Sequence, residues 1–381
     1  MTWGRRVNGR SRAATLLLGV VLAACGSASG PPSPIVAPAS TASPGAAAPA
    51  SLSTPAPTAT PTDGLSATPN PTPVETPTGT PAASGATGEI AFTATRDDVE
   101  GVYVEDVSSG MTTRLADGAS PAWSPDGTRI AFSRPPGSGP DTAFTLWTMN
   151  SDGSDPRALG EGLGPSWSPD GTRIAFSMSP IDLGDLWVMN ADGSGRRKLA
   201  GGSQHDWSPD GTRIASVAEA PGGAQAQLLV EHADGSGVTH LAAGELPAWS
   251  PDGARIAFVS WGEQPAIQVV DPATGVVSTV AALDTDAHTL AWSADGTRLS
   301  FVTLGGDLRV VSARGGEIET AATGLSFDAA RSPDGDWFAF TVRDPESPTS
   351  DIYLARADGS DRRQLTTSGT AFGPAWRPPQ G

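Results

Sequence analysis

The chain has 381 residues, with 24 basic and 41 acidic side chains, a formal net charge of −17 and one cysteine. This acidity argues against binding to nucleic acid or to anionic lipid headgroups, because both need basic surfaces. A single cysteine excludes a disulfide within the chain.

The first 24 residues have the pattern of an export signal. A short apolar stretch over 13–24 follows four arginines and is too short to span a bilayer as a mature helix. It ends in Leu-Ala-Ala-Cys-Gly over 22–26, which resembles a bacterial lipobox, whose cysteine becomes the lipidated first residue of the mature protein. We therefore predict a lipoprotein signal peptide over 1–24 and lipidation of Cys25. The alternative is an ordinary signal peptide with a chance cysteine near the cleavage site.

Residues 25–87 form a segment made almost wholly of Pro, Ser, Thr, Ala and Gly. Its only charged side chains are Asp63 and Glu75. It has too few large apolar groups to offset the entropy lost on ordering. We predict a disordered linker with polyproline-II character that tethers the rest of the chain, 88–381, to the membrane.

A ten-residue phrase recurs through the remainder of the chain. Trp-Ser-Pro-Asp-Gly-Thr-Arg-Ile-Ala-Phe occupies 123–132, and versions of it begin at 167, 207, 249, 292 and 331, with a partial copy at 376. The intervals of 39 to 45 residues, with short strands and turn residues between the copies, are typical of propeller blades.

One repeat shows how a blade would form. Strands are predicted at 165–168, 173–177, 185–189 and 197–199. The first two are joined by Ser-Pro-Asp-Gly, in which Ser bonds the backbone, Pro presets φ and Gly takes the left-handed conformation. The fold class is therefore all-β, a propeller of four-stranded antiparallel blades, with seven units by count.

The two ends of the propeller are expected to share one blade. The segment after residue 88 begins with a second strand, and the chain ends with a first strand over 374–376. Pairing of these strands would close the ring and leave no edge strand exposed.

The Ser-Pro-Asp-Gly and Ala-Asp-Gly-Ser turns together resemble the TolB-like, WD-like propeller repeat of bacterial extracytoplasmic proteins, over roughly 88–381. The resemblance implies a propeller and, by analogy, a scaffolding role in the cell envelope. TolB itself carries an α/β domain before its propeller, where this chain has the lipobox and linker. TolB-like propellers commonly have six blades, against the seven units counted in this chain.

A tryptophan and an arginine recur six residues apart in the repeats, and their order is reversed in the sixth copy. A pair that exchanges positions while keeping both members suggests contact across the hairpin. We predict structural cation–π stacks between neighbouring blades; unrelated drift in one copy is the alternative. The pairs are Trp123/Arg129, Trp167/Arg173, Trp207/Arg213, Trp249/Arg255, Trp292/Arg298 and Arg331/Trp337.

The candidate binding residues fall on one face of the propeller. Loops joining strands two to three and four to one share a face that is irregular and acidic, as binding faces usually are. The Ser-Pro-Asp-Gly and Ala-Asp-Gly-Ser turns share the other face, where the aspartates are expected to be turn formers.

Two departures from the repeat are predicted to ring the mouth of the central channel on the loop face. His205 and Asp206 precede one repeat tryptophan, and Asp284, Asp286 and His288 precede another. Histidine beside aspartate favours a site for a divalent cation or a basic peptide, and a solvated loop rim is the alternative.

An aromatic side chain is the remaining candidate on the loop face. Trp261 follows the second strand of its repeat and is a candidate recognition aromatic. The alternative is that its ring packs against the neighbouring loop.

No catalytic motif is present. The sequence lacks a Gly-x-Ser-x-Gly elbow, a His-Glu-x-x-His motif and a phosphate loop. We therefore predict a non-enzymatic propeller without a cofactor, anchored at the cell membrane or outer envelope and facing the periplasm or exterior. Its predicted partner is an envelope protein or glycan on the acidic loop face, and not nucleic acid. The alternative is a metal-dependent hydrolase or lyase that uses His205, Asp206 and His288.

Overall fold

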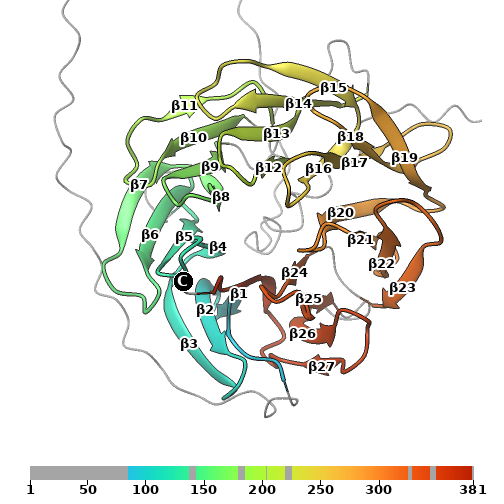
Figure 1. The fold of residues 1–381 in the computed structure, drawn as a ribbon. Helices are drawn as coiled ribbons and strands as arrows, with labels where there is room; N and C mark the ends of the chain where they lie inside the picture. The colour runs from blue at the N-terminus through green and yellow to red at the C-terminus, as the bar shows by residue number, and fades with distance from the viewer. Residues whose placement is uncertain are drawn as a thin grey trace, which may run out of the picture.

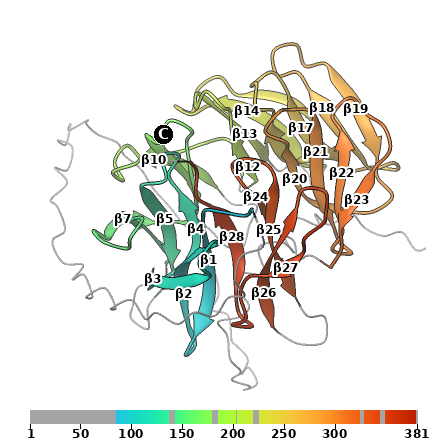
Figure 2. The ribbon, with the colours of Figure 1, turned by 60° about the horizontal axis from the view of Figure 1, so that its bottom comes forward.

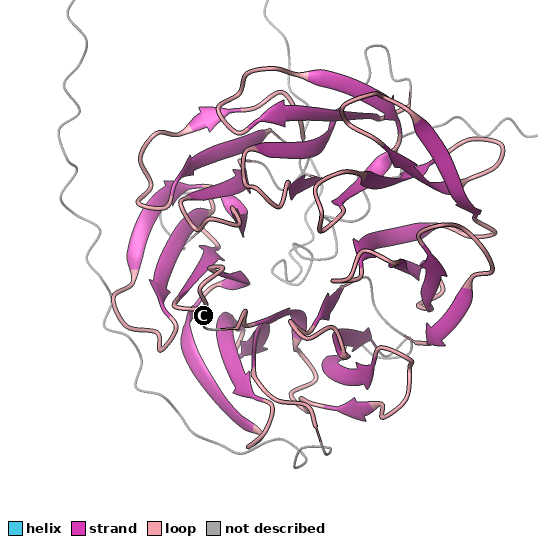
Figure 3. Ribbon diagram, viewed as in Figure 1, coloured by secondary structure: helices cyan, strands magenta, loops and turns pink. Residues whose placement is uncertain are grey.

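The computed structural model describes residues 85–136, 143–178, 185–202, 204–218, 225–324, 328–343 and 349–379. The predicted signal peptide, Cys25 and the linker up to residue 84 lie outside these ranges. The described chain forms strands and turns that build a ring of seven four-stranded antiparallel sheets (Figures 1 and 3). None of its residues forms a helix of the length and apolarity needed to cross a membrane.

The seven sheets follow one another in chain order. Blade 1 contains β28 (Phe372–Trp376), β1 (Glu89–Arg96), β2 (Val99–Asp106) and β3 (Met111–Asp117). Blade 2 contains β4 (Ala119–Trp123), β5 (Arg129–Arg134), β6 (Thr145–Asn150) and β7 (Arg157–Glu161). Blade 3 contains β8 (Leu163–Trp167), β9 (Arg173–Ser177), β10 (Leu186–Asn190) and β11 (Arg197–Lys198). Blade 4 contains β12 (His205–Trp207), β13 (Arg213–Ala218), β14 (Gln227–His232) and β15 (Thr239–Ala243).

The last three blades complete the ring. Blade 5 contains β16 (Glu245–Trp249), β17 (Ile256–Ser260), β18 (Ala266–Val270) and β19 (Val277–Ala282). Blade 6 contains β20 (Ala287–Trp292), β21 (Arg298–Thr303), β22 (Leu308–Ser312) and β23 (Glu319–Ala322). Blade 7 contains β24 (Ala329–Arg331), β25 (Trp337–Arg343), β26 (Ser350–Arg356) and β27 (Arg363–Gln364).

The predicted closure of the ring is confirmed. The last strand, β28, lies beside the first, β1 (Figure 2), and pairs with it antiparallel. The register places Ile90 opposite Trp376. Just beyond β28, the backbone N–H of Arg377 donates to the carbonyl of Glu89 at 2.8 Å, and the two side chains form an ion pair. The two ends of the ring therefore complete one four-stranded blade, and β1 is not left as an open edge.

The Ser-Pro-Asp-Gly turns are held by their own side chains. In blade 4, Ser208 donates its hydroxyl to the Asp210 carboxylate at 2.6 Å and accepts the backbone N–H of Arg213 at 2.9 Å. The same carboxylate accepts the backbone N–H of Thr212 at 3.0 Å. These hydrogen bonds, with that of Ser208 the strongest, hold the pKa of Asp210 at about 2. The carboxylate is thus satisfied within its own turn.

Neighbouring blades are joined by the repeat tryptophans. In five of them the indole N–H donates to the backbone carbonyl just before the last residue of the first strand in the preceding blade. This hydrogen bond recurs at four consecutive junctions and once more at blade 5 to 6. The donor–acceptor distances are 3.2 Å for Trp376–Ala330, 3.2 Å for Trp123–Ala375, 3.1 Å for Trp167–Ala122, 3.3 Å for Trp207–Ser166 and 3.0 Å for Trp292–Ala248.

The predicted contact across each hairpin is wrong, because the arginine of a repeat faces away from its own tryptophan. In every repeat the residue paired with that tryptophan is the one after the arginine, as with Trp249 and Ile256. Side chains alternate between sheet faces, so the arginine lies on the opposite face. The same register separates Arg331, which pairs with Phe338, from Trp337.

The cation–π stacks instead join an arginine of one blade to the tryptophan of the next. The guanidinium carbon lies 5.5 Å from the ring centroid for Arg173–Trp207, 4.8 Å for Arg213–Trp249 and 4.7 Å for Arg255–Trp292. In blade 1 Glu89 occupies the arginine position, and Arg377 supplies the guanidinium over Trp123 at 5.0 Å. The contact therefore links blades, with partners that come from different repeats.

Candidate functional site

On the turn face, the aspartate of each described turn accepts hydrogen bonds from groups of the same turn. The aspartates of the Ala-Asp-Gly-Ser turns accept the hydroxyl and backbone N–H of the following serine, as Asp234 does from Ser236 at 2.6 and 2.9 Å. These bonds lower the pKa of Asp234. Carboxylates committed to their own turns are poor ligands for anything else, which leaves the loop face as the candidate binding face.

The predicted residue Asp206 bridges two blades. It occupies the position just before the last residue of β12, where the other first strands have Ala or Ser. Its Oδ2 accepts the backbone N–H of Trp249 on β16 at 2.7 Å. Burial raises the pKa of Asp206 to about 6, against the hydrogen bonds from the Trp249 and Trp207 backbone. Its main interaction is therefore with the neighbouring first strand.

The second predicted group lies in a different blade. Asp284 pairs with Arg309 of β22 at 2.7 Å, and the carbonyl of Asp286 accepts the N–H of Leu304 at 3.2 Å. His288 is partly buried on β20; burial lowers its pKa, and the Asp286 charge opposes that shift.

The two predicted groups are not brought together as one site. His205 lies on β12 and His288 on β20, and blade 5, with its first strand β16, lies between them. Over the described ranges, no group of three or more His, Cys, Asp or Glu residues is arranged to hold a metal ion.

A third arrangement surrounds Trp261 at the loop end of blades 4 and 5. The indole is half-buried and packs against the blade 5–6 core beside Leu246. Gln225 donates to the Trp261 carbonyl at 2.7 Å, and Gln204 accepts the N–H of Leu246 at 2.8 Å. Burial raises the pKa of Glu245, while hydrogen bonds with Trp261 and Gln204 lower it. We call these five residues the Trp261 cluster.

The sequence reasoning identified Trp261 but missed its partners. Glu245 is the first residue of β16, four positions before Trp249. The matching positions in the first two repeats are Ala119 and Leu163. A carboxylate where the first two repeats have apolar residues was a readable signal. Its contact with Gln204 was not, because that contact crosses between repeats.

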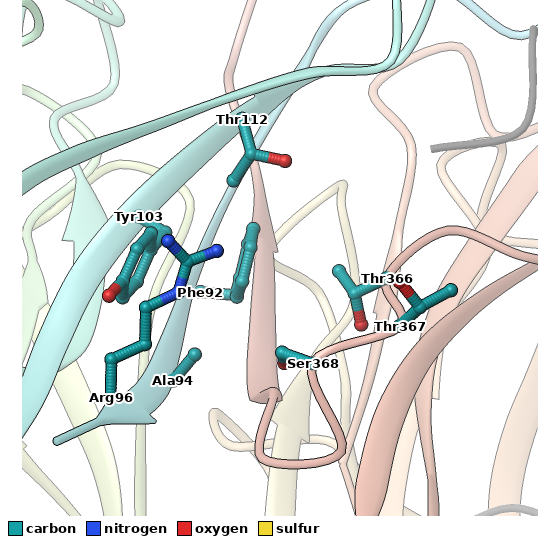
Figure 4. A pocket seen from close by; sticks show the side chains of 8 residues that line it. All are labelled: Phe92, Ala94, Arg96, Tyr103, Thr112, Thr366, Thr367 and Ser368. Atoms are coloured by element: carbon teal, nitrogen blue, oxygen red, sulfur yellow. The ribbon is translucent and has the colours of Figure 1, made fainter. Parts of the chain in front are cut away.

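A small cavity lies between blades 1 and 7 (Figure 4). It has a volume of about 60 Å³, which is room for water only, since one water occupies roughly 30 Å³ of liquid. Phe92 and Tyr103 stack with centroids 5.7 Å apart along one wall, and the Arg96 guanidinium lies 5.4 Å from the Tyr103 ring. Thr366, Thr367 and Ser368 form the opposite wall.

The fold is a seven-bladed β-propeller. Side chains that depart from the repeat, such as Glu245 and Trp261, lie on its loop face. Residues 212–381, somewhat less than half of the chain, match the family model described as the TolB beta propeller domain. The TolB-like character of the repeats is thus supported over that range. No curated protein matches the chain.

Several solved structures share the architecture. TolB from Acinetobacter baumannii is 18% identical with a TM-score of 0.51, covering 78% of this chain and 81% of that one. An oligogalacturonate lyase in complex with manganese is 16% identical with a TM-score of 0.58, covering 71% and 86%. An acylaminoacyl peptidase from Pyrococcus horikoshii is 16% identical with a TM-score of 0.55, covering 76% and 53%. At these identities the likeness shows the fold alone, and the fold serves several activities.

Proposed function

We propose that this chain is a non-enzymatic propeller, tethered to the membrane through lipid on Cys25, that binds an envelope protein or a glycan on its loop face. The observation that carries the proposal is the Trp261 cluster. It presents a half-buried indole, a carboxylate and two amides that are held by one another across two blades. Such rigid aromatic and polar groups are typical of the few residues that dominate binding energy.

The charge of the loop face favours a partner with donor groups. Glu245 begins β16 at the loop end of blade 5, and the whole chain carries a net charge of −17. An ionised carboxylate accepts hydrogen bonds and donates none. Hydroxyl groups of a glycan or basic side chains of a protein therefore complement it.

The position where the chain enters the ring supports the choice of face. Ala86 is buried beside blade 7, and the carbonyl of Gly88 accepts the N–H of Val107 at the turn end of blade 1. A tether attached there leaves from the turn face. The loop face would then point away from a membrane that holds the lipid anchor.

A crosslinking experiment tests this proposal. A photo-crosslinking amino acid replaces Trp261 in the full lipoprotein, and the protein is irradiated in native membranes. The matched control replaces Val276, an exposed residue on the turn side of blade 5. One dominant protein or glycan product from position 261, and not from position 276, is expected. Equal or absent crosslinking at the two positions would overturn the loop-face assignment.

Metal analysis separates this function from the hydrolase or lyase alternative. We expect the purified protein to contain no stoichiometric divalent metal, because the described residues offer no three-ligand cluster. Tight stoichiometric metal that disappears in His205→Ala would replace the binding role by the metal-dependent enzyme.

A further inference from the structure

A cavity of about 180 Å³ lies between blades 6 and 7, away from the Trp261 cluster. Leu299, Val310 and Phe338 form its apolar walls, and Arg298, Ser300 and Arg331 also line it. This junction is where the tryptophan at the end of the first strand is replaced by arginine.

The equivalent space at the preceding junction is filled by an indole. Trp292 packs in one buried cluster with Ala257, Val269, Leu299 and Ala313. The guanidinium of Arg255 lies 4.7 Å from its ring centroid. Trp207 lies in a matching setting, clustered with Ala175, Val188, Ile214 and Ala233.

The lining of the cavity matches that setting position by position. Within their blades, Ser300 pairs with Val310 as Ala257 pairs with Val269. Phe338 follows Trp337 on β25 as Leu299 follows Arg298 on β21. The cavity is thus the indole slot of the repeat. It lies at the one junction of the seven where the first strand ends in arginine, Arg331, instead of tryptophan.

Arg331 does not fill this slot. Its guanidinium folds back over its own turn, where Nε and Nη2 donate to the Gly335 carbonyl at 2.9 and 2.7 Å. It lies 5.3 Å from the Phe338 ring centroid. Arg298, the counterpart of Arg255, is held by Glu319 at 2.6 Å. Two cations and apolar walls therefore surround a space shaped by the fold for a planar aromatic ring.

We propose that the slot between blades 6 and 7 binds the indole ring of a small molecule, in place of the tryptophan side chain present at the other six junctions. An engineered apolar cavity of about 150 Å³ binds benzene, so the volume is sufficient for an aromatic ligand. Guanidinium groups attract the face of an aromatic ring. Asp358 also lines the cavity and Glu319 neutralises Arg298, which favours a neutral ligand over an anion.

Indole itself is the probe for the test. The purified full chain is titrated with indole, and binding is followed by ligand-observed NMR and by the melting temperature. We expect saturable binding that raises the melting temperature. Arg331→Trp fills the slot, so it should raise the melting temperature without ligand and weaken indole binding at least about tenfold. Arg157→Trp adds the same ring at an exposed position of blade 2 and should leave indole binding unchanged.

A second variant guards against misfolding of the first. Ser300→Leu narrows the slot from the opposite wall without altering Arg331, and it should weaken indole binding in the same way. Failure of the unmodified protein to bind indole saturably at millimolar concentration overturns the proposal. So does undiminished binding in folded Arg331→Trp or Ser300→Leu, because the indole would then sit elsewhere.

Discussion

At the scale of single residues, the departures from the repeat carry the chemistry. Asp206 replaces a small residue and uses its carboxylate to accept the Trp249 N–H of the next blade. Burial raises its pKa from the ordinary 3.8 to about 6. Between those values the folded protein keeps a proton that the unfolded chain releases. The contribution of Asp206 to stability therefore falls as pH rises from about 4 to 6.

Asp206→Asn should remove this dependence on pH. Asparagine keeps an acceptor for the Trp249 N–H but does not ionise. Its free energy of unfolding should improve relative to the unmodified protein as pH rises from 4 to 7, by at most about 3 kcal/mol. Chemical denaturation at both pH values measures the change. Asp284→Asn, which alters an exposed ion pair, is the control; a pH-independent difference for Asp206→Asn would contradict the burial argument.

At the scale of elements, two blades have outer strands of only two residues, β11 and β27. The blade that follows β11 has the buried Glu231, and the blade that follows β27 has the buried Glu105. The two glutamates hold the same register position, opposite Ile214 and Ile90. Glu231 accepts the backbone N–H groups of Ala200 and Gly201 at 3.0 to 3.1 Å. The carboxylate thereby satisfies donors that a longer strand would have paired.

Glu105 has a different set of partners at the second short strand. It accepts the Thr112 hydroxyl at 3.0 Å. Burial raises its pKa to about 7, while the Thr112 hydrogen bond and the charge of Arg363 on β27 oppose that shift. The two glutamates thus hold the same register position, each beside a short strand. Glu231 accepts backbone N–H groups, whereas Glu105 accepts a side-chain hydroxyl.

Glu231→Met should destabilise the propeller, although methionine occupies the matching positions Met149 and Met189 in blades 2 and 3. The substitution leaves the buried Gly201 N–H and the partly buried Ala200 N–H without this acceptor, at a cost of about 1–3 kcal/mol. Urea denaturation provides the measurement. Glu231→Gln retains an acceptor oxygen and should cost less than half as much. Equal losses in the two variants would show that the hydrogen bonds are not the cause.

At the scale of the whole molecule, the ring is held by contacts between distant parts of the chain. Trp123 lies under the guanidinium of Arg377 and donates its indole N–H to Ala375. Trp376 in turn donates to Ala330 of blade 7. The last strand therefore serves two junctions at once, and the unfolding of the blades should be coupled through it.

Deletion of residues 372–381 should open the ring. It removes β28, exposes the edge of β1 and empties the Trp376 slot, so cooperative unfolding should be lost. Calorimetry and circular dichroism would follow the transition. Deletion of 379–381 leaves β28 intact and should melt as the full protein does. An unchanged melting curve for the longer deletion would rule out the coupling.

The sequence alone determined the propeller, its seven blades and the closure by β28. Strand alternation and turn chemistry depend on local sequence, and the same local pattern occurs seven times along the chain. It also singled out Asp206 as a departure from the repeat and Trp261 as a candidate recognition aromatic. Only the tertiary structure decided that three repeat arginines stack on the tryptophan of the next blade, that Glu245 meets both Trp261 and Gln204, and that His205 and His288 stay apart. It likewise decided that Arg331 leaves an open slot. These contacts cross between repeats, so they depend on how whole blades pack and not on the spacing within any one of them.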